Sequence, residues 1–321
     1  MSVKNKPNEI YITRIYDAPL KMVWEAWVDP KKVAQWWGPR GFTLTSHSKD
    51  VKTGGTWAYT MHGPDGVDYP NKTQFLEVEK YSRMVYDHGG SDDRPPLFRV
   101  TALFNEIKGK TKIEMTMLFA SAEVAAETKK FIKKVSGDST WDRLAEYLAE
   151  EKDHKNIFVI NRSFDAPIDI IYGMWTDPKN IAQWLAPTGA EMKFIKADIR
   201  VDGSTFWRMD GANGTMFGRA KYLDMLHPTR IVYTQQFVDE NEKVSRHPLA
   251  PTWPETMLTT ITLAEEDAEK TRVTIAWEPY EDCSVEEIDI FKKSRAGMTL
   301  GWTGSFDKLE AHLEQNNNNK V

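Results

Sequence analysis

The sequence predicts an α+β protein built from two tandem copies of one domain. Each copy is expected to form a curved antiparallel sheet wrapped around a long C-terminal helix, with two short helices after the first strand. A tryptophan-rich segment, Trp24–Gly41, recurs as Tyr172–Gly189 at a constant offset of 148 residues (175 − 27). In both copies a strand-like stretch precedes this segment, alternating stretches come after it, and a helical stretch closes the copy. The same order of elements is therefore written twice.

The repeat sets the expected domain boundaries. We expect a first domain over residues 1-152 and a second over 157-321, each long enough to bury a core of its own. The polar segment Ala149–Asn156 lacks Pro and Gly. It is typical of a helix end that runs into a short linker.

The first copy is expected to open with a strand and a two-helix corner. Ile10–Asp17 carries apolar and β-branched residues on both faces, which favours a strand. Asp17-Ala18-Pro19 and Asp29-Pro30 each place a capping residue before a proline, a combination typical of helix starts. The second short helix is expected to end at Gly38-Pro39.

About six antiparallel strands are expected next. Trp57, Tyr59 and Met61 alternate with smaller residues, so one face of the sheet should be buried and aromatic. Two helical stretches, separated near Gly137, close the copy. The expected strands are Phe42–Val51, Thr56–Met61, Thr73–Glu79, Met84–His88, Phe98–Ile107 and Lys110–Phe119, and the helices are Ala122–Phe131 and Ser139–Glu151.

The second copy repeats this order. Its first strand is expected over Ile157–Asp165, its last strand pair over Met257–Leu263 and Thr271–Trp277, and one final helix over Val285–Leu313. The low-complexity tail Asn316–Asn319 is expected to lack order. The loop Asp239–Pro254 holds three prolines and is longer than its first-copy counterpart, which makes it either a lid or an idle insertion.

Composition excludes several classes of protein. A formal net charge of −5 argues against general nucleic-acid binding, which requires a basic face. No apolar run approaches the length that spans a bilayer, and the N-terminal residues show no secretory signal. The single cysteine, Cys283, permits no internal disulfide, and this fits a cytoplasmic location.

A set of motifs kept in both copies resembles a known family. The sequences R-x-[YF]-D-A-P, W-x-D-P, Q-W-[WL]-x-P, R-x-V-Y and, near the C-terminal end, [WF]-D-[KR]-L each occur twice. This pattern resembles the SRPBCC superfamily, which has the helix-grip fold of START and Bet v 1. Within it, the pattern is most similar to the C-terminal domain of the activator of Hsp90 ATPase. The resemblance covers nearly the whole chain and implies the helix-grip fold.

The resemblance implies three kinds of function. We expect a small hydrophobic or amphipathic ligand to bind in a cavity between the sheet and the C-terminal helix, without a further cofactor. One alternative is a stress-related, chaperone-interacting protein, which the family name suggests. The other is a cyclase or hydrolase, although no acid–base pair is repeated in the two copies.

Candidate cavity residues are the aromatic residues and methionines of the inner sheet face and of the short helices. For each of them, plain core packing competes with ligand contact. The candidates are Trp36, Trp37, Trp57, Tyr59, Met61, Phe75, Tyr86, Phe98, Met117, Trp184, Trp207, Met209, Tyr233 and Trp277.

Two arginines, Arg14 and Arg162, stand among apolar neighbours on the first strand of each copy. Each is expected to form an ion pair, with Asp50 and Asp198 as the suggested partners, or to anchor a ligand carboxylate or phosphate.

Other polar residues give weaker signals. His47, His62 and His88 fall on separate strands without metal-ligand spacing, so no metal site is expected. His62 with Asp65 is a possible acid–base pair. Acidic neighbours should raise the pKa of Cys283, which argues against a reactive thiol.

The two copies differ at positions of the inner wall. Thr205 stands where the first copy has Trp57, Leu185 replaces Trp37, and Ile275 replaces Met115. The sequence therefore predicts two unlike interiors, or one functional and one structural copy.

Overall fold

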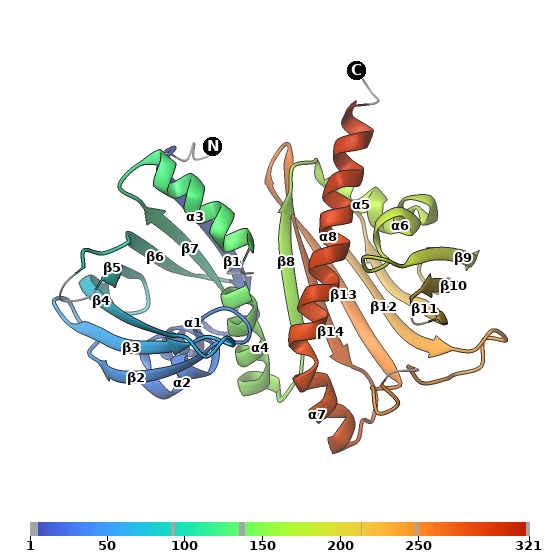
Figure 1. Cartoon of the computed structure of the whole chain (residues 1–321), viewed down its shortest axis with the longest axis horizontal. Coiled ribbons are helices and arrows are strands. Elements are labelled where there is room, and N and C mark those ends of the chain that lie inside the picture. Colours follow the sequence, from blue (N-terminus) through green and yellow to red (C-terminus); the bar gives the residue numbers. More distant parts are fainter. Residues whose placement is uncertain (1–5, 91–93, 135–138, 213, 248–249, 319–321) are drawn as a thin grey trace. The chain divides into compact units, whose positions relative to one another are not determined.

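The computed structural model describes residues 6–90, 94–134, 139–212, 214–247 and 250–318. The chain divides into two compact units, Met1–Lys155 and Asn156–Val321. Each unit contains one seven-stranded antiparallel sheet with helices against its inner face, so the expected α+β helix-grip fold is confirmed (Figure 1).

The first unit has the order of elements that the sequence predicts. Its sheet has the strand order β1-β7-β6-β5-β4-β3-β2, so the first and last strands of the unit pair with each other. The elements are β1 Glu9–Tyr16, α1 Leu20–Val28, α2 Pro30–Trp36, β2 Thr43–Lys49, β3 Thr56–His62, β4 Asp68–Glu79, β5 Arg83–Gly90, β6 Phe98–Ile107, β7 Lys110–Leu118, α3 Ala122–Lys134 and α4 Ser139–Asp153. The expected interruption at Gly137 lies outside the described residues.

The second unit repeats the topology as β8-β14-β13-β12-β11-β10-β9. Figure 1 shows α8 lying across the strands of this sheet. The elements are β8 Phe158–Phe164, α5 Ile168–Thr176, α6 Pro178–Trp184, β9 Glu191–Ala197, β10 Ser204–Gly211, β11 Gly214–Leu226, β12 Arg230–Val238, β13 Thr256–Asp267, β14 Lys270–Pro279, α7 Val285–Lys293 and α8 Arg295–Asn318.

Two expectations about the C-terminal end are wrong. The single helix over Val285–Leu313 is interrupted at Ser294, whose N–H bonds both the Ile290 and Phe291 carbonyls as the first segment ends. The tail was expected to lack order, but α8 continues through Asn316 to Asn318. Asn319 lies outside the described residues. The Asn316 amide lies 3.2 Å from His312 Nε2, one helical turn back, which gives the polar end of the helix a side-chain contact.

The two-helix corner is built in a similar way in both units. The expected cap at the first short helix is wrong: Pro19 is its N-cap without a side-chain hydrogen bond, and Asp17 pairs with Lys110 and Lys152 instead. Asp29 accepts hydrogen bonds from the N–H groups of Lys31 and Lys32, and Asp177 accepts one from Lys179, so each caps the second short helix. A tryptophan at the end of that helix then reaches back to the first. Trp36 Nε1 donates to the Ala26 carbonyl and Trp184 Nε1 donates to the Met174 carbonyl, each at 3.0 Å.

The cores explain why the corner is fixed. Trp36 and Trp184 are both 0% exposed. Each is surrounded by other apolar side chains of its own unit. A completely buried indole with a satisfied N–H contributes both apolar area and a hydrogen bond to folding. These two residues therefore have a structural role in closing the corner.

We predict that Trp36→Ala and Trp184→Ala each lower the free energy of unfolding by about 3–5 kcal/mol, because each leaves a large buried cavity. Urea unfolding followed by circular dichroism measures this. Trp36→Phe is the matched variant. It keeps an aromatic ring but loses the bond to Ala26, so its loss should be smaller. An alanine variant that keeps its stability would assign the residue to a binding site.

Candidate functional site

The inner faces of the two sheets carry the candidate residues. In the first unit, Trp57, Tyr59, Tyr86 and Met117 belong to the same hydrophobic core as the buried residues of α4. In the second unit, the register aligns Tyr233 with Thr259 and Thr259 with Trp277 across three neighbouring strands. The alternation in the sequence therefore predicted correctly which side chains share a face.

In the first unit most candidates pack against one another. Trp57 and Tyr59 stack with ring centroids 4.0 Å apart and are 2% and 1% exposed. Trp37 contacts the rings of Trp57, Trp36, Trp27 and Trp141 at 5.2–6.1 Å. Buried candidates in this unit are Trp36, Trp37, Trp57, Tyr59, Phe75, Tyr86 and Met117, whereas Met61 and Phe98 are partly accessible.

The first interior also contains buried polar groups. Burial raises the pKa of Tyr59, an effect that the neighbouring Trp37 and Thr73 side chains oppose. Burial likewise lowers the pKa of His88 to about 4. The His88 ring packs on Phe98 with centroids 4.9 Å apart, so the imidazole is neutral at physiological pH.

The second interior is arranged differently around its aromatic residues. Trp302, on α8, lies 5.5 Å from Trp277 of β14 and 6.1 Å from Trp175 of α5, measured between ring centroids. The indole nitrogens of all three are buried, and none has a hydrogen-bond partner among the described residues. An indole nitrogen can only donate, so each of these groups requires an acceptor that the described protein atoms do not supply.

A row of hydroxyl groups lies beside these indoles. Burial raises the pKa of Tyr222, with the Tyr233 phenol adding to the effect and the Thr205 hydroxyl opposing it. Burial also raises the pKa of Tyr233 to about 12, and the neighbouring Thr259 side chain opposes this rise. Because Thr259 pairs with Trp277 in the sheet, the hydroxyl row runs up to the unpaired indoles.

The candidates of the second unit are more accessible than their first-unit counterparts. Trp207, Met209 and Trp277 are partly accessible although they lie on the inner face, while Tyr233 and Trp184 are buried. The Trp207 ring lies against the backbone of Gly218, where an added Cβ would come within 2.1 Å of the ring. Only glycine permits this position of the indole.

The long loop after β12 lies against the same end of the inner face. The His247 ring contacts Phe237, whose ring in turn lies 6.5 Å from Trp207. Trp253 packs on Phe291, a completely buried residue of α7. The loop that was expected to be either a lid or an insertion is therefore attached to the interior by aromatic contacts.

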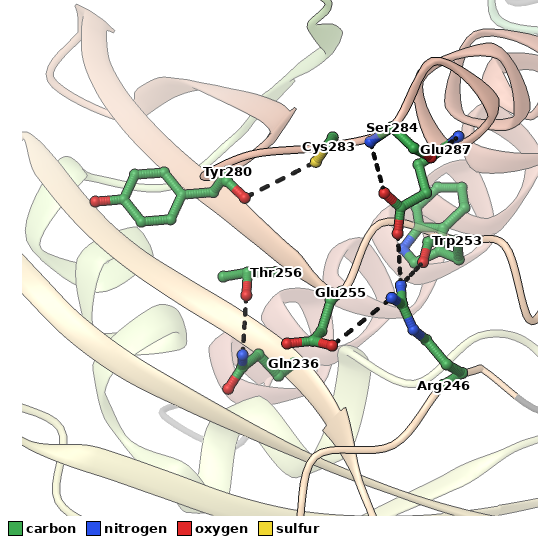
Figure 2. Close-up of polar contacts among 9 residues, drawn as sticks. All are labelled: Gln236, Arg246, Trp253, Glu255, Thr256, Tyr280, Cys283, Ser284 and Glu287. Atoms are coloured by element: carbon green, nitrogen blue, oxygen red, sulfur yellow. Dashed lines mark hydrogen bonds and ion pairs between the residues drawn. The ribbon is translucent and has the colours of Figure 1, made fainter.

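Arg246 joins this loop to α7 (Figure 2). Its guanidinium donates to the Trp253 carbonyl and to Glu287 Oε1, each at 2.7 Å, and lies 3.7 Å from Glu255. Glu287 also caps α7, because its carboxylate accepts from the Ser284 N–H. These bonds hold the pKa of Glu287 below its usual range, so the ion pair persists at neutral pH.

The suggested partners of the strand arginines are wrong. Arg162 pairs with Asp307 and Glu310 of α8, while Asp198 pairs with Arg200. Asp50 likewise pairs with Lys52, at the edge of the sheet opposite the strand of Arg14. Strand order explains the difference, because β1 and β8 lie far across the sheet from β2 and β9 and beside the C-terminal helix instead.

The remaining polar candidates do not form a reaction site. His62 pairs with Asp68 at 2.6 Å rather than with Asp65, because β3 and β4 align these two residues directly. His47 bonds Thr60 on an exposed strand. Among the described residues, no three metal-ligating side chains converge. Burial and then Glu287 raise the pKa of Cys283, in the direction that the sequence predicted.

Both units match one known protein family. The family described as Activator of Hsp90 ATPase homolog 1-like protein matches residues 17–149 and again 165–314. The chain belongs to this family. The resemblance inferred from the sequence motifs is thereby confirmed, and it applies to both tandem copies.

Solved structures similar to this chain include three with the following values. A protein from Chromobacterium violaceum is 27% identical, with 50% of this chain and 97% of that chain covered and a TM-score of 0.39. The AHSA1 protein from Silicibacter pomeroyi is 16% identical over 50% of this chain and 99% of its own, with a TM-score of 0.39. The di-domain ARO/CYC BexL from the BE-7585A biosynthetic pathway is 13% identical over 95% of this chain and 98% of its own, with a TM-score of 0.38. No curated protein matches the chain.

Sequence reasoning missed several residues of the second interior. Trp302 and Trp175 were not among the predicted cavity residues, yet Trp302 continues the apolar stripe of Phe306, Leu309 and Leu313 along α8. Phe237 and Thr259 were detectable only through strand register.

Within the described residues, no helix is long and apolar enough to cross a membrane.

We predict that His88 makes the stability of the first unit pH-dependent. Its folded pKa of about 4 lies below the unfolded value, so the unfolded chain takes up the proton first as pH falls. The stability is present above about pH 6.5 and is lost as the pH falls toward 4. Because His88 as a residue is partly accessible, we expect an extra loss on the order of 1–2 kcal/mol between pH 7 and 5.

His88→Gln is the matched variant, because the second copy has Gln235 at this place. Urea unfolding of both proteins at pH 7 and 5 measures the difference. An equal loss of stability in the wild type and the variant would show that His88 does not carry the effect.

Proposed function

We propose that this chain binds a small hydrophobic or amphipathic molecule between sheet and helix, and that the second unit is the binding copy. One observation carries the proposal: the rings of Trp175 and Trp277 both lie against Trp302, and the buried indole nitrogens of all three lack an acceptor among the described residues. Leaving a donor buried and unpaired costs about 1–3 kcal/mol, so three of them together call for a bound acceptor.

The surroundings specify the chemistry of the ligand. The walls beside the indoles are apolar and aromatic, so the body of the ligand is apolar. The three indoles offer only donors, so the ligand presents oxygen acceptors to them. The phenols of Tyr222 and Tyr233 stay protonated at neutral pH and add polar groups that can both donate and accept. A flat apolar molecule with carbonyl, sulfonate or carboxylate oxygens meets these conditions.

The first unit has the same frame and a different role. Its large inner residues contact one another, and its corner indole at Trp36 is satisfied by a backbone carbonyl. The Trp57 nitrogen is likewise satisfied by Ser46 at 3.0 Å. We therefore place the ligand in the second interior and not in the first. This division agrees with the difference between Trp57 and Thr205 that the sequence displays.

Ligand binding explains more of the structure than the alternatives do. The chaperone interpretation rests on the family description, which names the activator of the Hsp90 ATPase. An acid–base enzyme would place titratable groups together inside the fold. The His62–Asp68 pair instead belongs to the first unit and is exposed on its sheet.

We predict that the apolar probe 8-anilinonaphthalene-1-sulfonate binds the native protein and that Trp277→Phe/Trp302→Phe weakens its binding about fivefold or more. Phenylalanine keeps an aromatic ring but removes the two donors, each worth about 0.5–1.5 kcal/mol. Fluorescence titration gives both dissociation constants. Trp141→Phe, in the first unit, is the control and should leave the affinity unchanged. Equal effects of both variants, or no binding at all, would contradict the proposal.

We further predict that Arg246→Ala speeds release of the same probe by about three- to tenfold, because it removes charged hydrogen bonds that fasten the loop to α7. Stopped-flow dilution measures the release rate. Arg200→Ala is the control, since Arg200 is an exposed arginine of the same unit that pairs with neighbouring Asp198. An unchanged rate would make the loop an idle insertion.

A further inference from the structure

A bulge in the first sheet turns one lysine inward. Ser46 pairs with Tyr59 and Lys49 pairs with Trp57, so three steps along β2 correspond to two steps along β3. The extra residue, His47, is taken up by the register shift. Strict alternation would place Ser46 and Lys49 on opposite faces. The bulge places both on the inner face, beside the two aromatic residues.

The Lys49 amine ends in an apolar environment. Its Nζ lies 3.1 Å from the centroid of the Trp57 ring. The Nζ atom is buried and has no hydrogen-bond partner among the described residues. Trp57 is itself fixed, because its nitrogen donates to Ser46 and its ring stacks on Tyr59. The amine therefore rests on a rigid aromatic surface.

The balance of charge around the amine favours its neutral form. Burial lowers the pKa of Lys49 well below its usual value, and the Asp29 carboxylate opposes this shift. The Asp29 carboxylate already accepts hydrogen bonds from the N–H groups of Lys31 and Lys32 as a helix cap. The attraction of an ammonium to an indole face is weaker than the cost of burying an unpaired ion.

We propose that Lys49 is a nucleophilic amine that captures small apolar aldehydes as an imine. The Nζ lone pair attacks the carbonyl carbon, and the carbonyl oxygen takes a proton to give a carbinolamine. The hydroxyl group then leaves as water while the nitrogen loses its proton and the C=N bond forms. No oxidant or reductant is consumed. Lys49 is partly accessible as a residue although its Nζ is buried, so a small aldehyde reaches the amine from the solvent side of this residue.

This site belongs to the first unit alone. The bulge recurs in the second unit, where Thr205 pairs with Ala197 and Trp207 pairs with Phe194. Ala197 there stands in the place of Lys49, and Thr205 in the place of Trp57. The capture site is therefore independent of the ligand proposed for the second unit, and either proposal can fail without the other.

Reductive trapping tests the proposal on the full chain. Native protein is treated at pH 7 with propanal and cyanoborohydride for increasing times, and each lysine is quantified by peptide mass spectrometry. We expect Lys49 to be modified at least about tenfold faster than Lys52, since each pH unit of pKa depression gives tenfold more neutral amine. Lys52 is the internal control because it is exposed, pairs with Asp50 and has a raised pKa.

Two further measurements make the result decisive. The rate of modification against pH gives the pKa of Lys49 in the native chain, and a value near the ordinary 10.5 would overturn the proposal. Lys49→Arg should abolish the fast phase, whereas Lys52→Arg should leave it intact. Modification of Lys49 no faster than Lys52, or only after urea is added, would also overturn it.

Discussion

The hydrogen bond from a corner indole to the preceding helix is the interaction on which the rest of each unit depends. Trp36 and Trp184 close the angle between the two short helices by donating to the backbone ten residues earlier. That angle brings the helices against the inner face of the sheet. Without it, neither interior would have a closed end. The recurrence of these tryptophans in the sequence is thus a requirement of folding.

Once the frame is fixed, the interiors are free to differ. A tryptophan whose nitrogen meets a backbone carbonyl or Ser46 contributes only to stability in the first unit. The same residue type in the second unit leaves its nitrogen without a partner among the described residues at Trp175, Trp277 and Trp302. A protein can retain buried, unpaired donors, which cost free energy, where a bound molecule supplies the missing acceptors. The duplication permits unpaired donors in the second unit, because the first unit folds around a separate core of its own.

Local patterns in the sequence were sufficient to predict the frame of each unit. The repeat, the strand alternation and the Asp-Pro helix starts placed the elements correctly, because each depends on neighbouring residues. The partner of Arg162 could not be predicted, since Asp307 and Asp198 are both distant in sequence and only strand order decides between them. The interruption at Ser294 carries no Gly or Pro signal. The unpaired indoles of Trp175, Trp277 and Trp302 lie on three different elements, α5, β14 and α8. No local sequence pattern in any one of these elements predicts that they come together.

The bulge in β2 shows how a single register shift governs chemistry. Both copies contain it, at His47 and at Ile195, so it belongs to the fold and not to one function. Its effect depends on the residue that it turns inward. Alanine at position 197 adds a small apolar group, whereas lysine at position 49 carries an amine into an aromatic interior that solvates ions poorly. The fold thus provides one inward position in each copy, and the side chain placed there decides whether it is inert or reactive.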